Sequence, residues 1–223
     1  MKLLALDTST EACSAAAMVD DEVIERYELA PRRHAALILP MIEAVLAEAG
    51  LTAGQLDAVA FGRGPGAFTG IRIGVGVAQG IAFAADLPVA PISTLAAVAY
   101  NAYSERNASH IAVALDARMG EVYWATYSAT AEGGVTLLGA EQVCSPIAVP
   151  GLNGADWLGA GTGWTVYNEI LAQRLGTLTW WGDCYPRAGD IALLGAVAGQ
   201  RGQWVDAEQA LPVYLRDEVA SKS

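Results

Sequence analysis

Histidine and cysteine are scarce in this chain of 223 residues, which contains two histidines and three cysteines. Cys13, Cys144 and Cys184 lie far apart, so they have neither the spacing of a zinc site nor the pattern of a disulfide framework. The two histidines, His34 and His110, make a histidine-based catalytic metal centre improbable. We therefore predict no bound metal and a cytoplasmic location.

Basic residues are also in short supply. Lysine and arginine number 13 against 24 aspartates and glutamates, which gives a formal net charge of −11 at pH 7. No dense basic patch is present, whereas binding to a phosphate backbone depends on clustered lysine and arginine. The composition therefore argues against direct binding of nucleic acid, and any link to RNA has to run through another component.

Long uninterrupted hydrophobic runs are missing as well. The most apolar stretch contains Arg72 and Gln79 and is short for a bilayer span, and the N-terminus lacks the features of a signal peptide. We therefore expect no membrane segment. Hydrophobic residues nevertheless make up 53% of the chain and charged residues 17%, so we expect a partner to cover part of the apolar surface.

Glycine, in contrast, is plentiful between Phe61 and Ala85. A predicted strand runs into a loop with Gly64 and Gly66, and a helix is predicted over 70–85. This order of strand, glycine-rich turn and helix can direct backbone N–H groups at an anion, and Thr69 is a suitable helix N-cap. The spacing is that of neither a P-loop nor G-x-G-x-x-G. A phosphate contact and a plain packing turn both remain open.

The same predicted helix carries two pairs of glycines four residues apart, Gly70/Gly74 and Gly76/Gly80. Residues at this spacing share one side of a helix, and without side chains they let another element approach closely. The contact is expected to be either with the core or with another subunit.

A second predicted helix, over 33–49, is apolar on nearly every side. One side can pack on a sheet, so the other side needs a second cover. Pro40 is expected to kink this helix or to mark its start. His34 at the entrance is a possible ligand, although a single histidine there is more commonly a cap or a packing residue.

The second half of the chain repeats the pattern of the first. A strand, an aspartate, a short turn and another strand occur around Asp7 and again around Asp116. The repeat predicts two similar α/β domains, with a border in the polar stretch 105–109 that gives domains 1–104 and 105–223. Both aspartates end a strand, where α/β sheets place ligands, but aspartate also favours turns, and both interpretations stay open.

Two domains of this kind resemble those of the actin-like ATPase superfamily. Within it, the chain resembles the TsaB (YeaZ) family in the stretches LALDTSTEACSAA, RRHAALILPMI, FGRGPGAFTGIRIGVGVAQGIA, LDARMGEVY and LPVYLRDEVA. The resemblance covers the whole chain. It implies an α/β fold of two tandem actin-like (ribonuclease H-like) domains, each a mixed sheet with flanking helices.

The resemblance implies a non-catalytic scaffold or activating subunit in the formation of threonylcarbamoyladenosine at position 37 of tRNA. The related enzyme TsaD transfers the threonylcarbamoyl group and uses a metal held by a His-x-x-x-His motif. The matching positions here are Thr94 and Val98, which cannot replace histidine as ligands. The implied partners are a TsaD-like transferase and, through the complex, a TsaE-like ATPase, with a homodimer in isolation.

The resemblance also implies which residues form each site. The helices 33–49 and 70–85 are expected to form a four-helix bundle with the matching pair of TsaD, through His34, Leu37, Ile38, Met41, Ile42, Val45, Gly70, Ile73, Gly74 and Val77. The phosphate side of a vestigial nucleotide site is expected at Asp7, Thr8, Ser9, Gly64, Gly66, Thr69 and Asp116. Weak or no nucleotide binding is expected there, and no cofactor is expected to be required.

Two other functions compete with this one. An independent ATP-dependent kinase of the actin-like superfamily would use Asp7 and Asp116 as magnesium or base residues, but such kinases are usually much longer. A metallopeptidase would need metal ligands that the sequence does not supply. We therefore favour the non-catalytic subunit over both the kinase and the metallopeptidase.

Overall fold

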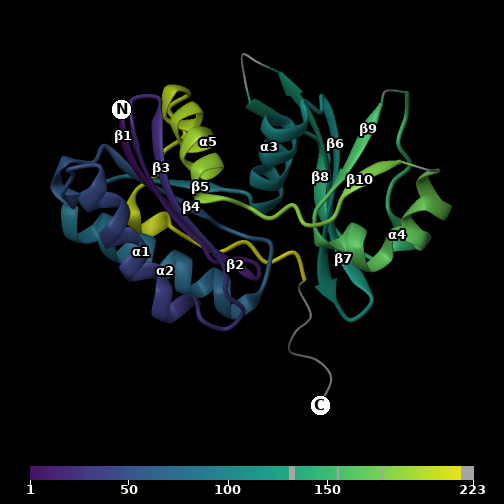
Figure 1. Ribbon diagram of the computed structural model, residues 1–223, viewed down its shortest axis with the longest axis horizontal. Helices are drawn as coiled ribbons and strands as arrows, with labels where there is room; N and C mark the ends of the chain where they lie inside the picture. Colours follow the sequence, from purple (N-terminus) through teal and green to yellow (C-terminus); the bar gives the residue numbers. More distant parts are fainter. Residues whose placement is uncertain (131–133, 155, 177, 217–223) are drawn as a thin grey trace. The chain divides into compact units, whose positions relative to one another are not determined.

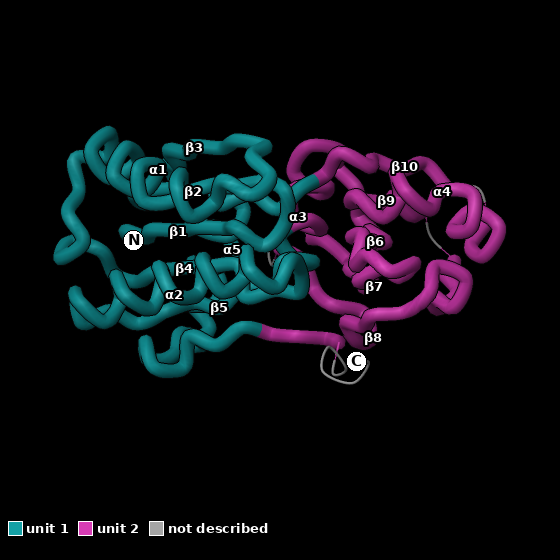
Figure 2. The backbone as a smooth tube through the Cα atoms, turned by 90° about the horizontal axis from the view of Figure 1, so that it is seen from below, with its two compact units in different colours: residues 1–97, 185–212 teal, residues 98–184, 213–223 magenta. Residues whose placement is uncertain are grey.

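The computed structural model (Figure 1) describes residues 1–130, 134–154, 156–176 and 178–216. The chain forms two compact units (Figure 2). One consists of residues 1–97 and 185–212, and the other of residues 98–184 together with the segment from residue 213 onward. The first unit is therefore discontinuous, because the chain leaves it, builds most of the second unit and then returns.

The first unit contains a five-stranded mixed sheet. Its strands, in sheet order, are β3 (Glu22–Leu29), β2 (Ala12–Val19), β1 (Lys2–Asp7), β4 (Ala58–Gly62) and β5 (Val89–Ile92). β1 to β3 form an antiparallel meander, and β4 and β5 join parallel to β1. The central strands β1, β2 and β4 are buried along nearly their whole length, which explains their continuous apolar sequences.

Helices cover both faces of this sheet (Figure 1). α1 (His34–Glu48) and α2 (Phe68–Ala85) share one core with the side chains of Leu4 and Leu6 on β1. α5 (Ala188–Gln200) packs on the other face, and it lies close because Gly195 faces Ala60: a Cβ at Gly195 would stand 2.8 Å from that of Ala60. The short helices η1 (Ala53–Gln55) and η3 (Ala207–Gln209) also belong to this unit.

The second unit repeats the first sheet strand for strand. Its order is β8 (Gly134–Cys144), β7 (Glu121–Thr130), β6 (His110–Arg118), β9 (Trp157–Ala160) and β10 (Thr179–Trp181). Again the first three strands form an antiparallel meander and the last two join in parallel. The duplication predicted from the two aspartate turns is therefore confirmed.

The helices of the second unit are arranged differently. α4 (Thr162–Leu175) packs on the sheet through Trp164, which lies against Trp124 of β7. α3 (Thr94–Arg106) begins in the first unit and continues into the second. Between β8 and β9, where the first unit has α1, the described residues contain only the short helix η2 (Pro146–Ala148) and loops. One face of the second sheet is therefore covered by less helix.

The fold class is confirmed, but the chain divides differently from the predicted border between residues 104 and 105. The units meet within α3, at 97/98, and α5 belongs to the first unit rather than the second. The reason is packing: the small residues on one side of α5 fit the small residues on the open face of the first sheet. Residues 217–220, which end the LPVYLRDEVA stretch, lie outside the described residues.

The helix ends also correct the sequence interpretation. α2 begins at Phe68, and its N-cap is Ala67 without a side-chain hydrogen bond, so Thr69 is not the cap. α1 runs through Pro40 instead of starting there, on an exposed side where water can reach the carbonyl group that proline leaves unbonded. Ser93 caps α3, because the N–H of Leu95 donates to its hydroxyl at 3.1 Å.

α2 is long and apolar enough to cross a membrane by length and composition alone. The core helix of a globular protein can pass the same test, so this is weak evidence. In this structure one side of α2 is buried in the first unit, at Gly70, Ile71, Gly74, Val75, Ala78 and Ala82.

The two glycine pairs of α2 face different surroundings. A methyl group at Gly70 would overlap the carbonyl oxygen of Thr8, and one at Gly74 would stand 2.6 Å from Thr8 Oγ1. At Gly76 and Gly80, in contrast, a methyl group would meet no atom of the described residues within 4 Å beyond the backbone of α2 itself and the adjacent residues. The first pair therefore lets α2 touch the loop after β1. The second pair leaves free space on the surface of α2.

We predict that Gly70→Ala lowers the free energy of unfolding by about 3 kcal/mol, because the new methyl group pushes α2 away from Thr8. Gly76→Ala should raise it by about 0.5–1 kcal/mol, because alanine favours a helix more than glycine does and meets no atom there. Urea unfolding followed by circular dichroism measures both. A Gly70→Ala protein as stable as the unchanged one would contradict the close contact.

Candidate functional site

A buried polar cluster follows β1. Asp7, Thr8 and Ser9 are 1%, 1% and 0% exposed. The N–H and the hydroxyl of Ser9 both donate to Asp7 Oδ1 at 2.9 Å, and the Thr94 hydroxyl donates to Ser9 Oγ at 3.0 Å. The Thr8 hydroxyl donates to the carbonyl oxygen of Gly70 at 2.7 Å. These hydroxyl groups therefore bond to other parts of the first unit.

The glycine-rich loop after β4 closes over this cluster. Gly66 lies so near that a Cβ there would overlap the carbonyl oxygen of Ser9, and the Ala67 N–H donates to the same oxygen at 2.7 Å. The structure thus brings together five of the predicted phosphate-side residues: Asp7, Thr8, Ser9, Gly64 and Gly66. Thr69 lies apart from them, exposed on α2.

Asp7 is held in surroundings that disfavour its charge. Burial raises the pKa of Asp7 to about 6, although the two hydrogen bonds from Ser9 act in the opposite direction. Gly62 of β4 leaves room for the carboxyl group, because a Cβ there would overlap Asp7 Oδ2. The cluster therefore packs the end of β1 tightly around a carboxyl group that is costly to ionise.

Asp116 occupies the equivalent place in the second unit. Asp7 Oδ1 accepts a hydrogen bond from the N–H of Ser9, and Asp116 Oδ1 accepts one from the N–H of Arg118 at 2.9 Å. A bond to the N–H two residues further on is an Asx turn. Both aspartates thus shape the turn into the next strand, which supports the turn interpretation.

The positions matched to the transferase histidines lie in α3. Thr94 and Val98 are both fully buried, and the Thr94 hydroxyl is bonded to Ser9. Within the part of the chain that the structure describes, no group of three or more His, Cys, Asp and Glu side chains could hold a metal ion. The absence of a metal remains a prediction, and the structure shows what fills these positions.

A second candidate site lies on the side of α1 and α2 turned away from the sheet. Here several apolar side chains are only partly buried, because they pack against the core and are still reached by solvent. The open glycines of α2 lie beside them. We call this surface the outer helix face, and it consists of Leu37, Met41, Ile73, Gly76, Val77 and Gly80.

Six of the ten predicted interface residues face inward instead, which corrects the sequence interpretation. Ile38, Ile42 and Val45 are 1%, 4% and 0% exposed, and Gly70 and Gly74 contact Thr8. His34 is 8% exposed, and its Nε2 lies 3.2 Å from the carbonyl oxygen of Ala12, so it is a packing residue.

The sequence could not separate the two sides, because both sides of each helix are apolar or small. Leu37, Met41, Ile73 and Val77 remain as predicted interface residues. Gly76 and Gly80 were missing from the predicted interface. Their regular spacing was the available signal, but the inward pair shows the same spacing.

We predict that Asp7 makes stability depend on pH between about pH 4 and pH 6. The folded protein keeps the proton on Asp7 up to a pH of about 6, whereas an unfolded aspartate releases it near pH 4. The free energy of unfolding therefore falls as the pH rises through this window, by about 3 kcal/mol for this group.

Asp7→Asn should remove this contribution and give a protein more stable than the unchanged one at neutral pH. Urea unfolding at a series of pH values measures the difference between the two proteins. Glu43→Gln, at an exposed position of α1, is the control for loss of a negative charge. An Asp7→Asn protein less stable at neutral pH would show that the ionised carboxylate stabilises the loop.

Comparisons with known proteins identify the family. Residues 20–223 match the family model described as TsaD: tRNA N6-adenosine threonylcarbamoyltransferase. The chain is 41% identical to the tRNA threonylcarbamoyladenosine biosynthesis protein TsaB of Escherichia coli (strain K12), over 100% of this chain and 97% of that protein. It is 43% identical to TsaB of Haemophilus influenzae, over 100% of this chain and 96% of that protein.

Solved structures show the same fold. YeaZ from Pseudomonas aeruginosa is 49% identical, with a TM-score of 0.89 over 96% of this chain and 99% of that one. A second structure, described as an uncharacterized protein with similarity to peptidase YeaZ from Pseudomonas aeruginosa, is 48% identical with a TM-score of 0.90. The chain therefore belongs to the TsaB (YeaZ) family of tRNA threonylcarbamoyladenosine biosynthesis proteins, and its role is in this modification of tRNA.

Proposed function

We propose that this chain is a non-catalytic subunit that binds a TsaD-like threonylcarbamoyl transferase through its outer helix face. The observation that carries the proposal is the row of partly buried apolar side chains beside two open glycines. Apart from the neighbouring residues and the backbone of α2 itself, no atom of the described residues lies within 4 Å of the place where a Cβ would stand at Gly76 or Gly80. A surface of this kind is suited to a partner helix.

Two features support a subunit without chemistry of its own. The family model that the chain matches is that of the transferase, but Thr94 and Val98 stand where the transferase is expected to have its metal-binding histidines. The polar cluster around Asp7 uses its hydroxyl groups in internal hydrogen bonds. On this proposal the chain needs no cofactor, binds nucleotide weakly or not at all, and works in the cytoplasm.

Two helices of a partner would complete a four-helix bundle on this face. Because Gly76 and Gly80 have no side chains, a partner helix can approach to about 8 Å between axes, the short end of helix packing. A standard interface buries about 1,600 Å² and draws most of its affinity from a few central residues. In isolation the same face would form a homodimer, so self-association and transferase binding would compete.

The remaining partners follow from the same arrangement. A TsaE-like ATPase would join through the assembled complex. The net charge of −11 leaves contact with the tRNA phosphates to another subunit. On this proposal the chain contributes affinity for the transferase and holds it in position.

We predict that Met41→Glu weakens both self-association and transferase binding by about 30-fold or more, as expected for loss of roughly 2 kcal/mol at a central residue. The physical reason is that the new carboxylate loses its water in the bundle without gaining a partner. Sedimentation measures self-association, and a pull-down with the TsaD-like transferase measures binding. Threonylcarbamoyladenosine formation in a reconstituted system should fall in parallel.

The matched control is Val166→Glu, which places the same charge on an exposed apolar position of α4, the counterpart of α2 in the second unit. This variant should associate normally, and circular dichroism should be native for both. If Met41→Glu and a second variant, Leu37→Glu, stay folded and bind as tightly as the unchanged chain, the interface lies elsewhere.

We also predict that the purified chain alone hydrolyses neither ATP nor peptides above background, because the described residues contain no metal-binding cluster. ATP turnover is measured for the chain alone and then with the transferase present. Turnover by the chain alone would favour the kinase function. Stoichiometric zinc retained after chelation and desalting would favour the metallopeptidase function.

A further inference from the structure

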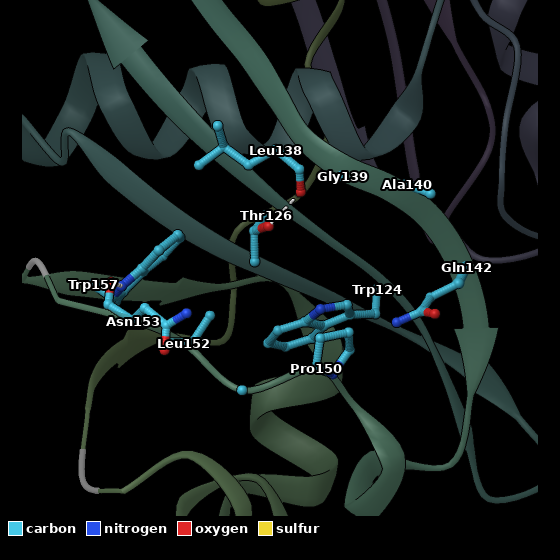
Figure 3. Close-up of a pocket in the computed structure, with 11 residues that line it drawn as sticks. Trp124, Thr126, Leu138, Gly139, Ala140, Gln142, Pro150, Leu152, Asn153 and Trp157 are labelled. Atoms are coloured by element: carbon cyan, nitrogen blue, oxygen red, sulfur yellow. Dashed lines mark hydrogen bonds between the residues drawn. The ribbon is translucent and has the colours of Figure 1, made fainter.

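The second unit has a pocket in the region where the first unit has a helix. In the first unit α1 joins β3 to β4 and packs on β2. In the second unit the link from β8 to β9 contains η2 and a loop, and a pocket of about 430 Å³ opens between this loop and the strands β7 and β8 (Figure 3). A volume of this size is typical of small-molecule sites.

An irregularity in β8 shapes the pocket. Trp124 pairs with Gln142 and Thr126 with Leu138, so a single residue of β7 faces three residues of β8. Gly139, at this point, has a φ of +95°, which favours glycine over other residues. Such bulges bend a strand and redirect its side chains. The equivalent strands β2 and β3 pair in continuous register, so this irregularity distinguishes the second unit.

The lining of the pocket is uncharged and largely apolar. Trp124 and Trp157 supply aromatic surface, and Leu138 supplies aliphatic surface. The side chains of Gln142 and Asn153 add amide groups, and Figure 3 shows them on different sides of the pocket. None of the residues that line it carries a charge. A ligand that fits is therefore neutral, because a charged one would lose its water without gaining a counter-charge.

Trp124 brings an unused hydrogen-bond donor to this site. Its side chain is 1% exposed and lies along the pocket (Figure 3), and among the described residues none accepts a hydrogen bond from its indole nitrogen. The other deeply placed indoles are satisfied: Trp164 donates to Ala112 and Trp204 donates to Gly195, each at 2.8 Å. The Trp124 indole nitrogen is instead reached by solvent at the pocket, where it can donate to an acceptor on a ligand.

We propose that this pocket binds a neutral, planar heteroaromatic molecule of about the size of a nucleobase. A ring nitrogen or carbonyl oxygen accepts from the Trp124 indole N–H, the amide of Gln142 bonds a second polar edge, and Trp157 offers stacking surface. A partner helix is not the occupant, because a helix with its side chains is about 10 Å wide and the loop with Asn153 already covers part of the strands. The site is independent of the outer helix face.

The test is a titration of the full chain, labelled with ¹⁵N, in which the indole N–H signals of its six tryptophans are followed by NMR. Trp124→Phe assigns the Trp124 signal, and the probes are adenine and uracil. The expected result is a saturable shift of the Trp124 signal with at least one of these probes. Toluene, a planar ring without an acceptor, should not cause it. No shift with either base, or an equal shift with toluene, would overturn the proposal.

Paired variants locate the binding. Leu138→Ala and Trp157→Ala, in the lining, should each weaken the affinity about tenfold, since stacking and contact with one side chain contribute that order of affinity. Leu137→Ala is the matched control, because Leu137 neighbours Leu138 on β8 but points to the other face of the sheet. These variants leave Trp124 in place, so the test stands even if Trp124→Phe fails to fold. Equal weakening by Leu137→Ala would show that the pocket is not the site.

Discussion

The contact between the loop after β1 and the glycine side of α2 determines what the first unit presents to a partner. Because Gly70 and Gly74 have no side chains, α2 lies directly against Thr8, whose hydroxyl bonds the carbonyl oxygen of Gly70. This contact fixes the rotation of α2 about its own axis, and Gly76 and Gly80 are open as a result. The same loop holds the Asp7 and Ser9 cluster. The buried polar cluster and the outer helix face therefore depend on one close approach.

The two units show how one sheet can support different surfaces. Strand order, strand directions and the aspartate turn are the same in both. The connection from the third strand to the fourth differs, since it forms α1 in the first unit and a short helix with a loop in the second. The first unit thereby gains an apolar helix pair, and the second gains a pocket beside Trp124.

Most of the fold could be predicted from the sequence, because local patterns of apolar residues indicate strands and helices. The site was only partly predictable. The pairs Gly70/Gly74 and Gly76/Gly80 have identical spacing, and only the position of Thr8 in space decides which pair faces inward. The predicted border placed the segment of α5 in the second domain, which was wrong for a similar reason. An apolar helix of small residues fits any sheet with small residues. The pocket depends on an irregular pairing around Gly139, which no periodic pattern reveals.

The discontinuity of the first unit has a consequence for the order of events on the ribosome. The N-terminal strands are synthesised first, but α5, which packs on Ala60 and Leu3, comes from residues 185–212. Until that segment emerges, one face of the first sheet has no helix on it, whereas most of the second unit is contiguous and can complete earlier. Domains generally fold in the order in which they emerge, but we expect the first unit to finish folding only after residues 185–212 have been synthesised. We expect a nascent chain halted before residue 185 to expose the sheet face on which α5 packs.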